Sequence, residues 1–192
     1  MSELLRVERE GPIASVVLIW PEKLNALSFA SWSELGKQMR ELSADTDLRC
    51  VILRGAGDKA FAAGADISEF PDLRADSTQG RTYGELIHDT MLAVSDCLHP
   101  TIAMIRGVCV GGGLEVALGC DLRIASEDSR FGIPIKRLGL TMGYGELMAL
   151  LAVVGPAVAR EILLEGRVFD ARDDMAERRQ RRGKGLTARS CL

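Results

Sequence analysis

The sequence has 192 residues, of which 47% are hydrophobic and 27% charged, with a formal net charge of −3. These values are ordinary for a soluble single-domain protein and give no support for a surface that binds nucleic acid or anionic membranes. The N-terminal residues lack the basic and apolar regions of a signal peptide, and no apolar run approaches membrane-spanning length. The five cysteines contain no C-x-x-C pair and the two histidines form no ligand pattern, so we expect reduced thiols, no metal site and a cytoplasmic location.

The first third of the chain predicts two strands, a helix and a third strand. Residues 4–10 and 14–19 read as a hairpin that turns at Gly11-Pro12. Ser28 is suited to cap a helix that runs to about Leu42, because apolar residues follow it at helical spacing: Trp32, Leu35, Met39 and Leu42. The apolar run 50–53 predicts a buried strand.

Residues 59–70 predict a loop of small residues that enters a short helix. The small side chains could expose backbone amides to a ligand, but the segment alone favours simple tight packing. Residues 71–81 show no periodicity and predict a mobile surface segment. A helix over 82–98 follows, and His99-Pro100 stops it.

The centre of the chain combines a strand, a glycine turn and a helix start. The apolar run 101–105 breaks at Gly107, and three glycines, 111–113, precede Glu115 in the first turn of a helix. Without a Cβ at Gly112, a substrate carbonyl can approach the backbone amide beside an acid/base carboxylate. Glycines there also permit close packing, and a first-turn glutamate also suits the helix dipole. The stretch alone favours this second interpretation, and it contains no G-x-G-x-x-G dinucleotide motif.

The last part of the chain continues the alternation of strands and helices. Residues 121–125 and 129–132 predict short strands, and 133–140 a loop with Lys136-Arg137 on its solvated rim. An apolar helix runs from 143 through 154, and Pro156 opens another that ends at Gly166. The pattern predicts a mixed α/β fold.

Two of these loops resemble one family. Ala62-Ala63-Gly64-Ala65-Asp66-Ile67 resembles the first oxyanion loop of the enoyl-CoA hydratase/isomerase (crotonase) family, and the segment Gly107 to Glu115 resembles the second. The flanks are similar as well: residues 24–27, 120–125, 131–134 and 159–166. The resemblance covers about residues 3–171. It implies an α/β fold built as a crotonase-like spiral of strand-strand-helix units, with residues 1–171 as its core domain.

The resemblance also implies the roles of individual residues. The backbone amides of Ala65 and Gly112 would bind the thioester oxygen of an acyl-CoA and stabilise its enolate, and Glu115 would act on water or on a substrate proton. No separate cofactor is implied, because coenzyme A is part of the substrate. The residues expected to line the substrate are Leu24, Ala26, Ala63, Gly64, Asp66, Ile67, Gly111 and Ile135.

The sequence departs from the family pattern at the second glutamate. That residue follows the proline of Phe-Gly-x-Pro, but here Pro134 is followed by Ile135, which cannot transfer a proton. Hydration by two carboxylates is therefore in doubt. Glu146 stands where the family usually has glycine at the next helix start. It is a candidate partial substitute, although a role as helix-dipole partner is an equally good interpretation.

A second departure lies at the C-terminal end. Residues 172–192 form a basic tail without an apolar face, which we interpret as a truncated or frame-shifted end. Relatives form trimers or hexamers, and we expect a homotrimer or hexamer here if the C-terminal part is complete enough.

The sequence thus predicts an acyl-CoA enzyme of fatty acid metabolism with hydratase or double-bond isomerase chemistry. Other enolate chemistry, by a decarboxylase or a thioester hydrolase, is the alternative within the same fold. A non-catalytic acyl-CoA-binding or assembly protein is the alternative outside enzymes. We expect neither a nucleic-acid nor a membrane partner.

Overall fold

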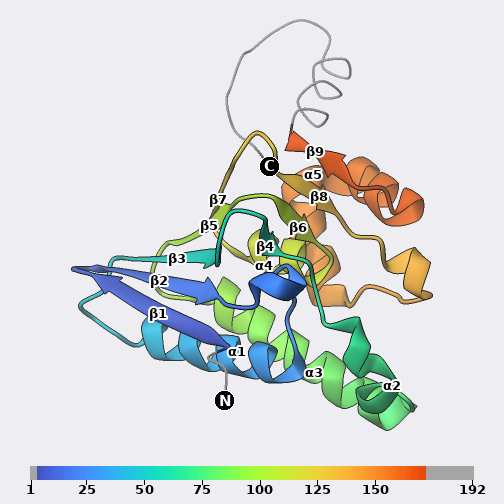
Figure 1. The fold of residues 1–192 in the computed structure, drawn as a ribbon, viewed down its shortest axis with the longest axis horizontal. Helices are drawn as coiled ribbons and strands as arrows, with labels where there is room; N and C mark the ends of the chain where they lie inside the picture. Colours follow the sequence, from blue (N-terminus) through green and yellow to red (C-terminus); the bar gives the residue numbers. More distant parts are fainter. Residues whose placement is uncertain (1–3, 172–192) are drawn as a thin grey trace, which may run out of the picture.

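The computed structural model describes residues 4–171, which form two sheets and the helices around them (Figure 1). The first sheet has five strands in the order β1-β2-β3-β5-β7. Only β1 and β2 pair antiparallel; the other neighbours are parallel. The strands are β1 (Leu5–Glu10), β2 (Ile13–Leu18), β3 (Cys50–Gly55), β5 (Thr101–Ile105) and β7 (Leu122–Ala125).

The second sheet is smaller and has the order β4-β6-β8-β9. Its first three strands are parallel, and β9 is antiparallel to β8. The strands are β4 (Ala60–Ala62), β6 (Val108–Val110), β8 (Arg130–Gly132) and β9 (Phe169–Asp170).

The chain alternates between the two sheets before each helix. A strand of the first sheet leads to one of the second and then to a helix, three times in succession: β3-β4-α2/α3, β5-β6-α4 and β7-β8-α5. The helices are α1 (Phe29–Ser43), α2 (Phe70–Leu73), α3 (Ser77–Ser95), α4 (Gly112–Gly119) and α5 (Tyr144–Glu165), with short 3₁₀ turns η1 (Pro21–Lys23), η2 (Ile67–Glu69) and η3 (Ile135–Leu138). This confirms the predicted spiral of strand-strand-helix units.

The first helix forms for the reasons that the sequence indicates. The Ser28 hydroxyl accepts a hydrogen bond from the Ser31 backbone N–H at 3.1 Å, which caps the helix start. The four predicted core residues of this helix are all buried: Trp32, Leu35, Met39 and Leu42. Figure 1 shows α1 and α3 side by side under β1 and β2, and the two helices pack against each other.

Residues 71–81 lie at the surface as expected, but most of them are helical, which the sequence analysis did not predict. Pro71 lies in the first turn of α2, and α3 begins at Ser77, where the Asp76 carboxylate accepts from the N–H groups of Thr78 and Gln79. The first turn of α3 is exposed, so it carries no apolar stripe from which a helix could be recognised. The helix also ends earlier than expected, at Ser95.

The last helix is apolar and interrupted. Gly155 has non-helical dihedrals (φ 76°, ψ 167°) directly before Pro156, so α5 consists of two helical segments, as the sequence predicts. Contrary to the expectation that no apolar run approaches membrane-spanning length, α5 could cross a membrane by length and composition, and 17% of its apolar window is buried. A single helix of this kind is weak evidence for a membrane-spanning segment, because a helix in the core of a soluble protein meets the same criterion.

The short strands β4, β6 and β9 are absent from the sequence-based expectation. Each has only two or three residues, and its partners lie far away along the chain. The predicted basic tail, residues 172–192, lies outside the described residues.

We predict that Ser28→Ala lowers the free energy of unfolding by about 1 kcal/mol, because the helix loses its N-terminal acceptor. Ser33→Ala, at an exposed position of the same helix, is the control and should be neutral or slightly stabilising. Urea unfolding of both variants measures the difference. Equal stabilities would show that the Ser28 cap contributes nothing.

Candidate active site

The first of the two resembling loops follows β4 and is tied to residues 24–27. Gly64 adopts a positive φ of 96°, and its carbonyl accepts from the Leu27 N–H at 2.7 Å. Ala65 forms an isolated parallel bridge with Leu27, and the Ala63 N–H donates to the Leu24 carbonyl at 3.0 Å. These hydrogen bonds join the two segments directly before Ala65.

The second loop follows β6 and begins α4. Gly111 has a φ of 51° and precedes the helix, and its N–H donates to the Gly132 carbonyl at 2.8 Å. Gly112 is the first residue of α4, so its N–H has no acceptor within the helix.

The structure brings the Ala65 and Gly112 amides together. A Cβ on Gly112 would lie 3.5 Å from the Ala65 nitrogen, and a Cβ on Gly64 would lie 3.1 Å from the Gly112 nitrogen. Within residues 4–171, neither N–H donates a hydrogen bond. Gly113 permits this approach, because a Cβ there would overlap the Ala62 carbonyl. Two unused donors therefore converge beside the helix start, an arrangement suited to a developing negative charge.

The Trp32 ring packs against Gly112, next to this pair of amides. Sequence reasoning missed this role. Its ring atom Cζ2 lies 2.7 Å from the position of a Gly112 Cβ, and the side chain is fully buried. Burial, followed by the charge of Glu69, raises the pKa of the neighbouring Tyr83 to about 12. The Trp32 indole N–H weakly lowers that pKa, although neither its nitrogen nor the Tyr83 oxygen has a partner of hydrogen-bond geometry in the described structure. Helical spacing marked Trp32 only as a core residue.

Glu115 lies in the first turn of α4, the helix that begins at Gly112. The residue keeps some exposed surface, whereas its carboxyl group is enclosed by protein atoms. This burial, together with the negative charge of Glu146, raises the Glu115 pKa from 4.5 to about 7. Both protonation states of Glu115 are therefore populated near neutral pH, as an acid/base requires.

The two candidates for a second carboxylate position differ. Ile135 lies in η3, half-buried and packed against the core, and carries no ionisable group. Glu146, in the first turn of α5, is 7% exposed, and its side chain folds back against Gly143. Its charge acts on Glu115 across the contact between α4 and α5.

Asp66 and Ile67, both expected at the substrate, have other surroundings. Burial opposes ionisation of Asp66, but hydrogen bonds from Lys23 and Ser68 outweigh it and lower the pKa. The Lys23 ammonium lies 2.8 Å from the Asp66 carboxylate, which also caps η2. Asp66 therefore holds the loop in place. Ile67 is 55% exposed.

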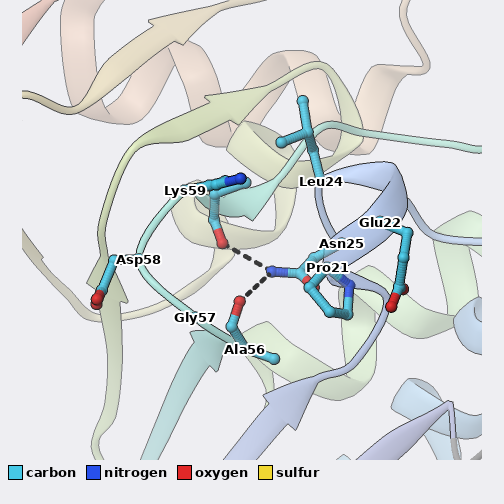
Figure 2. A pocket seen from close by; sticks show the side chains of 9 residues that line it. Pro21, Glu22, Leu24, Asn25, Ala56, Gly57, Asp58 and Lys59 are labelled. Carbon is cyan, nitrogen blue, oxygen red and sulfur yellow. Dashed lines mark hydrogen bonds between the residues drawn. The ribbon is translucent and has the colours of Figure 1, made fainter.

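A cavity of about 350 Å³ adjoins the loop of residues 24–27 (Figure 2). Leu24, 38% exposed, and Lys59 line it, and Ala26 follows along the same loop. Asn25, which sequence reasoning missed, fixes the cavity wall: in a left-handed conformation (φ 55°), its amide donates to the Ala56 and Ala60 carbonyls at 3.0 and 2.8 Å. A hydropathy pattern does not reveal an asparagine in the left-handed conformation, so the sequence carries no signal for this role.

The described residues contain no group of three or more side chains arranged to hold a metal ion. The polar groups of the two loops that resemble the family are backbone N–H donors and carboxylates.

Comparison with known proteins gives a consistent result. A family model described as enoyl-CoA hydratase/isomerase matches residues 8–178. Over 157 residues the chain is 38% identical to a short-chain-enoyl-CoA hydratase of Clostridium acetobutylicum, a match covering 82% of this chain and 59% of that protein. A crotonyl-CoA hydratase of Syntrophomonas wolfei is 33% identical over 88% of this chain and 64% of its own length. The chain thus spans about three fifths of these curated relatives.

Solved structures agree with this result. An enoyl-CoA hydratase/carnithine racemase of Magnetospirillum magneticum superposes with a TM-score of 0.88 and 45% identity, covering 93% of this chain and 67% of that one. An enoyl-CoA hydratase of Bacillus anthracis gives a TM-score of 0.84 at 32% identity, covering 91% and 67%.

We predict that Gly112→Ala destabilises the protein by about 1–3 kcal/mol, because the new methyl group meets the Trp32 ring. The matched control is Gly84→Ala in α3, where a Cβ meets nothing within 4 Å. That change should stabilise the protein by about 0.5–1 kcal/mol. Urea unfolding of both variants is the measurement, and similar effects would show that the turn tolerates a side chain.

We also predict that Glu115 makes stability depend on pH. Since the folded protein holds the Glu115 proton up to about pH 7 and the unfolded chain releases it near 4.5, the contribution of Glu115 is present below pH 4.5 and lost as pH rises through 7. Glu115→Gln cannot ionise, so it should exceed the parent by up to about 3 kcal/mol at pH 8 and match it at pH 4. Unfolding at both pH values tests this. A difference independent of pH would contradict the raised pKa.

Proposed function

Because the chain belongs to the enoyl-CoA hydratase/isomerase family, we propose that it binds an acyl-CoA thioester and stabilises the enolate of that thioester. One observation carries the proposal: the Ala65 and Gly112 N–H groups converge and have no acceptor within the described part of the chain. A thioester oxygen placed between them would receive two hydrogen bonds. These bonds strengthen as negative charge develops on the oxygen, and the donors need no reorganisation.

Glu115 is the acid/base of this proposal. Its carboxyl group lies in the helix that begins at Gly112, and its pKa of about 7 lets it both accept and return a proton near neutral pH. Removal of a proton next to the thioester carbonyl, followed by its return at another carbon, moves a double bond. Glu115 alone suffices for this isomerisation. Activation of water by the same carboxylate would begin a hydration.

The coenzyme A part of the substrate would lie along residues 24–27 and the cavity beside them. Leu24 offers apolar surface, and the exposed Lys59 offers positive charge for a phosphate. Ala63 and Gly64 link this loop to Ala65 through the backbone hydrogen bonds described above, so the thioester would reach the two amides from the cavity. The proposal assigns no metal and no separate cofactor.

We further propose that copies of the chain assemble through α5, as a homotrimer or hexamer, in the cytoplasm. The supporting observation is that large apolar side chains of α5 face solvent: Tyr144 is 90% exposed, Leu164 72% and Met148 63%. Apolar patches of this kind mark interaction surfaces. Fatty acid metabolism is the setting that the family suggests, and decarboxylation or thioester hydrolysis remains the alternative chemistry of the same enolate.

The test is Glu115→Gln, assayed on crotonyl-CoA for hydration and on a 3-enoyl-CoA for isomerisation. We expect a loss of about 10²–10⁴-fold in rate, because a positioned acid/base is removed. Isothermal titration with butyryl-CoA should show unchanged affinity. Glu10→Gln, which removes an exposed carboxylate from β1, is the control and should have the parent activity.

Two outcomes would contradict the proposal. Parent activity in Glu115→Gln would exclude this residue as the acid/base. Binding of several acyl-CoAs by the parent protein without any turnover would favour the non-catalytic acyl-CoA-binding alternative.

A further inference from the structure

Glu146 is a buried carboxylate without a stabilising partner. It is 7% exposed, and within residues 4–171 it has neither an ion pair nor a hydrogen bond. Enclosing a carboxylate in protein without a partner is unfavourable, and carboxylates in such positions are candidates for a functional site.

The ordinary structural explanation does not account for the position of this side chain. A glutamate in the first helical turn can reach back and accept from the N–H of the residue that precedes the helix. The Glu146 side chain does fold back onto Gly143, but no N–H of this turn donates to it in the described structure. The dipole of α5 favours a negative charge here, yet it does not require the charge to turn into the protein.

Among the described groups around the start of α5, Glu115 is the electrostatic partner of Glu146. Glu115 lies on α4, which packs against α5, and the Glu146 charge raises the Glu115 pKa. From α3, the His88 imidazole lies against Gly145 at the exposed rim. From η3, Ile135 contributes no charge, and Lys136 is directed to the Leu164 carbonyl at the opposite end of α5.

We propose that Glu146 is the second catalytic carboxylate of this site and that it and Glu115 lie on either side of the bound enoyl group. This inference rests on the proposed function. It replaces the carboxylate that the resemblance places at position 135, so the second acid/base comes from the start of α5 instead of from η3.

In hydration, the two carboxylates would divide the proton transfers between them. The water oxygen bonds to carbon 3 of the enoyl thioester, and the proton it loses passes to the ionised carboxylate. The electrons of the carbon 2–carbon 3 double bond move into the thioester, whose oxygen is held by Ala65 and Gly112. The protonated carboxyl group then gives its proton to carbon 2, and the thioester carbonyl re-forms. One proton is taken from water and one is delivered to carbon 2, so the protein ends with as many protons as it began.

The activity test compares Glu146→Gln with the parent and with the Glu10→Gln control on crotonyl-CoA. We expect a fall in kcat for hydration of about 10²–10⁴-fold, with unchanged affinity for butyryl-CoA. Restored hydration in the double variant Glu146→Gln/Ile135→Glu would support the relocation. Hydration by Glu146→Gln at the parent rate would overturn the proposal.

A second readout does not depend on turnover. Infrared difference titration of the carboxyl groups, with the free protein, should show a lower pKa for Glu115 in Glu146→Gln than in the parent. An unchanged Glu115 pKa in the variant would overturn the juxtaposition of the two carboxyl groups. If the parent neither binds nor converts an acyl-CoA, the proposed function fails, whereas the infrared result still decides whether the pair exists.

Discussion

The close approach of two backbone turns is the constraint on which the site depends. Parallel pairing of β4 with β6 brings the turns that follow them to one edge of the second sheet, where Gly64 and Gly112 come into contact. Side chains there would fill the space in which the two amides meet, and Trp32 closes it from below. The topology of the sheets and the absence of side chains, rather than polar residues in the loops, create the pair of free donors.

Two acidic side chains, Asp66 and Glu146, are buried to nearly the same extent but have different surroundings. Asp66 is 6% exposed, pairs with the Lys23 ammonium and accepts hydrogen bonds from Ser68, so its pKa is lowered and it holds a loop. Glu146 is 7% exposed but has no cation within the described residues, and its charge helps to raise the pKa of Glu115 to about 7. Burial and this charge both oppose ionisation of Glu115, which places its titration near neutral pH.

The sequence predicts the longer regular elements and both loops, but not the shortest strands or the contacts between distant segments. The Ser28 cap with its apolar spacing predicts α1, and the glycine turn predicts the start of α4, because both signals are local. The strands β4 and β6 are too short to show a period and exist through pairing across the chain. The first turn of α3 is solvent-exposed and so resembles a loop. The position of Trp32 under Gly112 and the inward turn of Glu146 depend on packing between distant segments, which no local pattern encodes.

The most direct test of the central claim is a crystal structure with bound butyryl-CoA, which keeps the thioester but offers no double bond. The account predicts the thioester oxygen at about 2.7–3.1 Å from both the Ala65 and the Gly112 nitrogen. It also predicts the Glu115 carboxyl beside carbon 2. A thioester bound elsewhere, with both amides left to water, would contradict it.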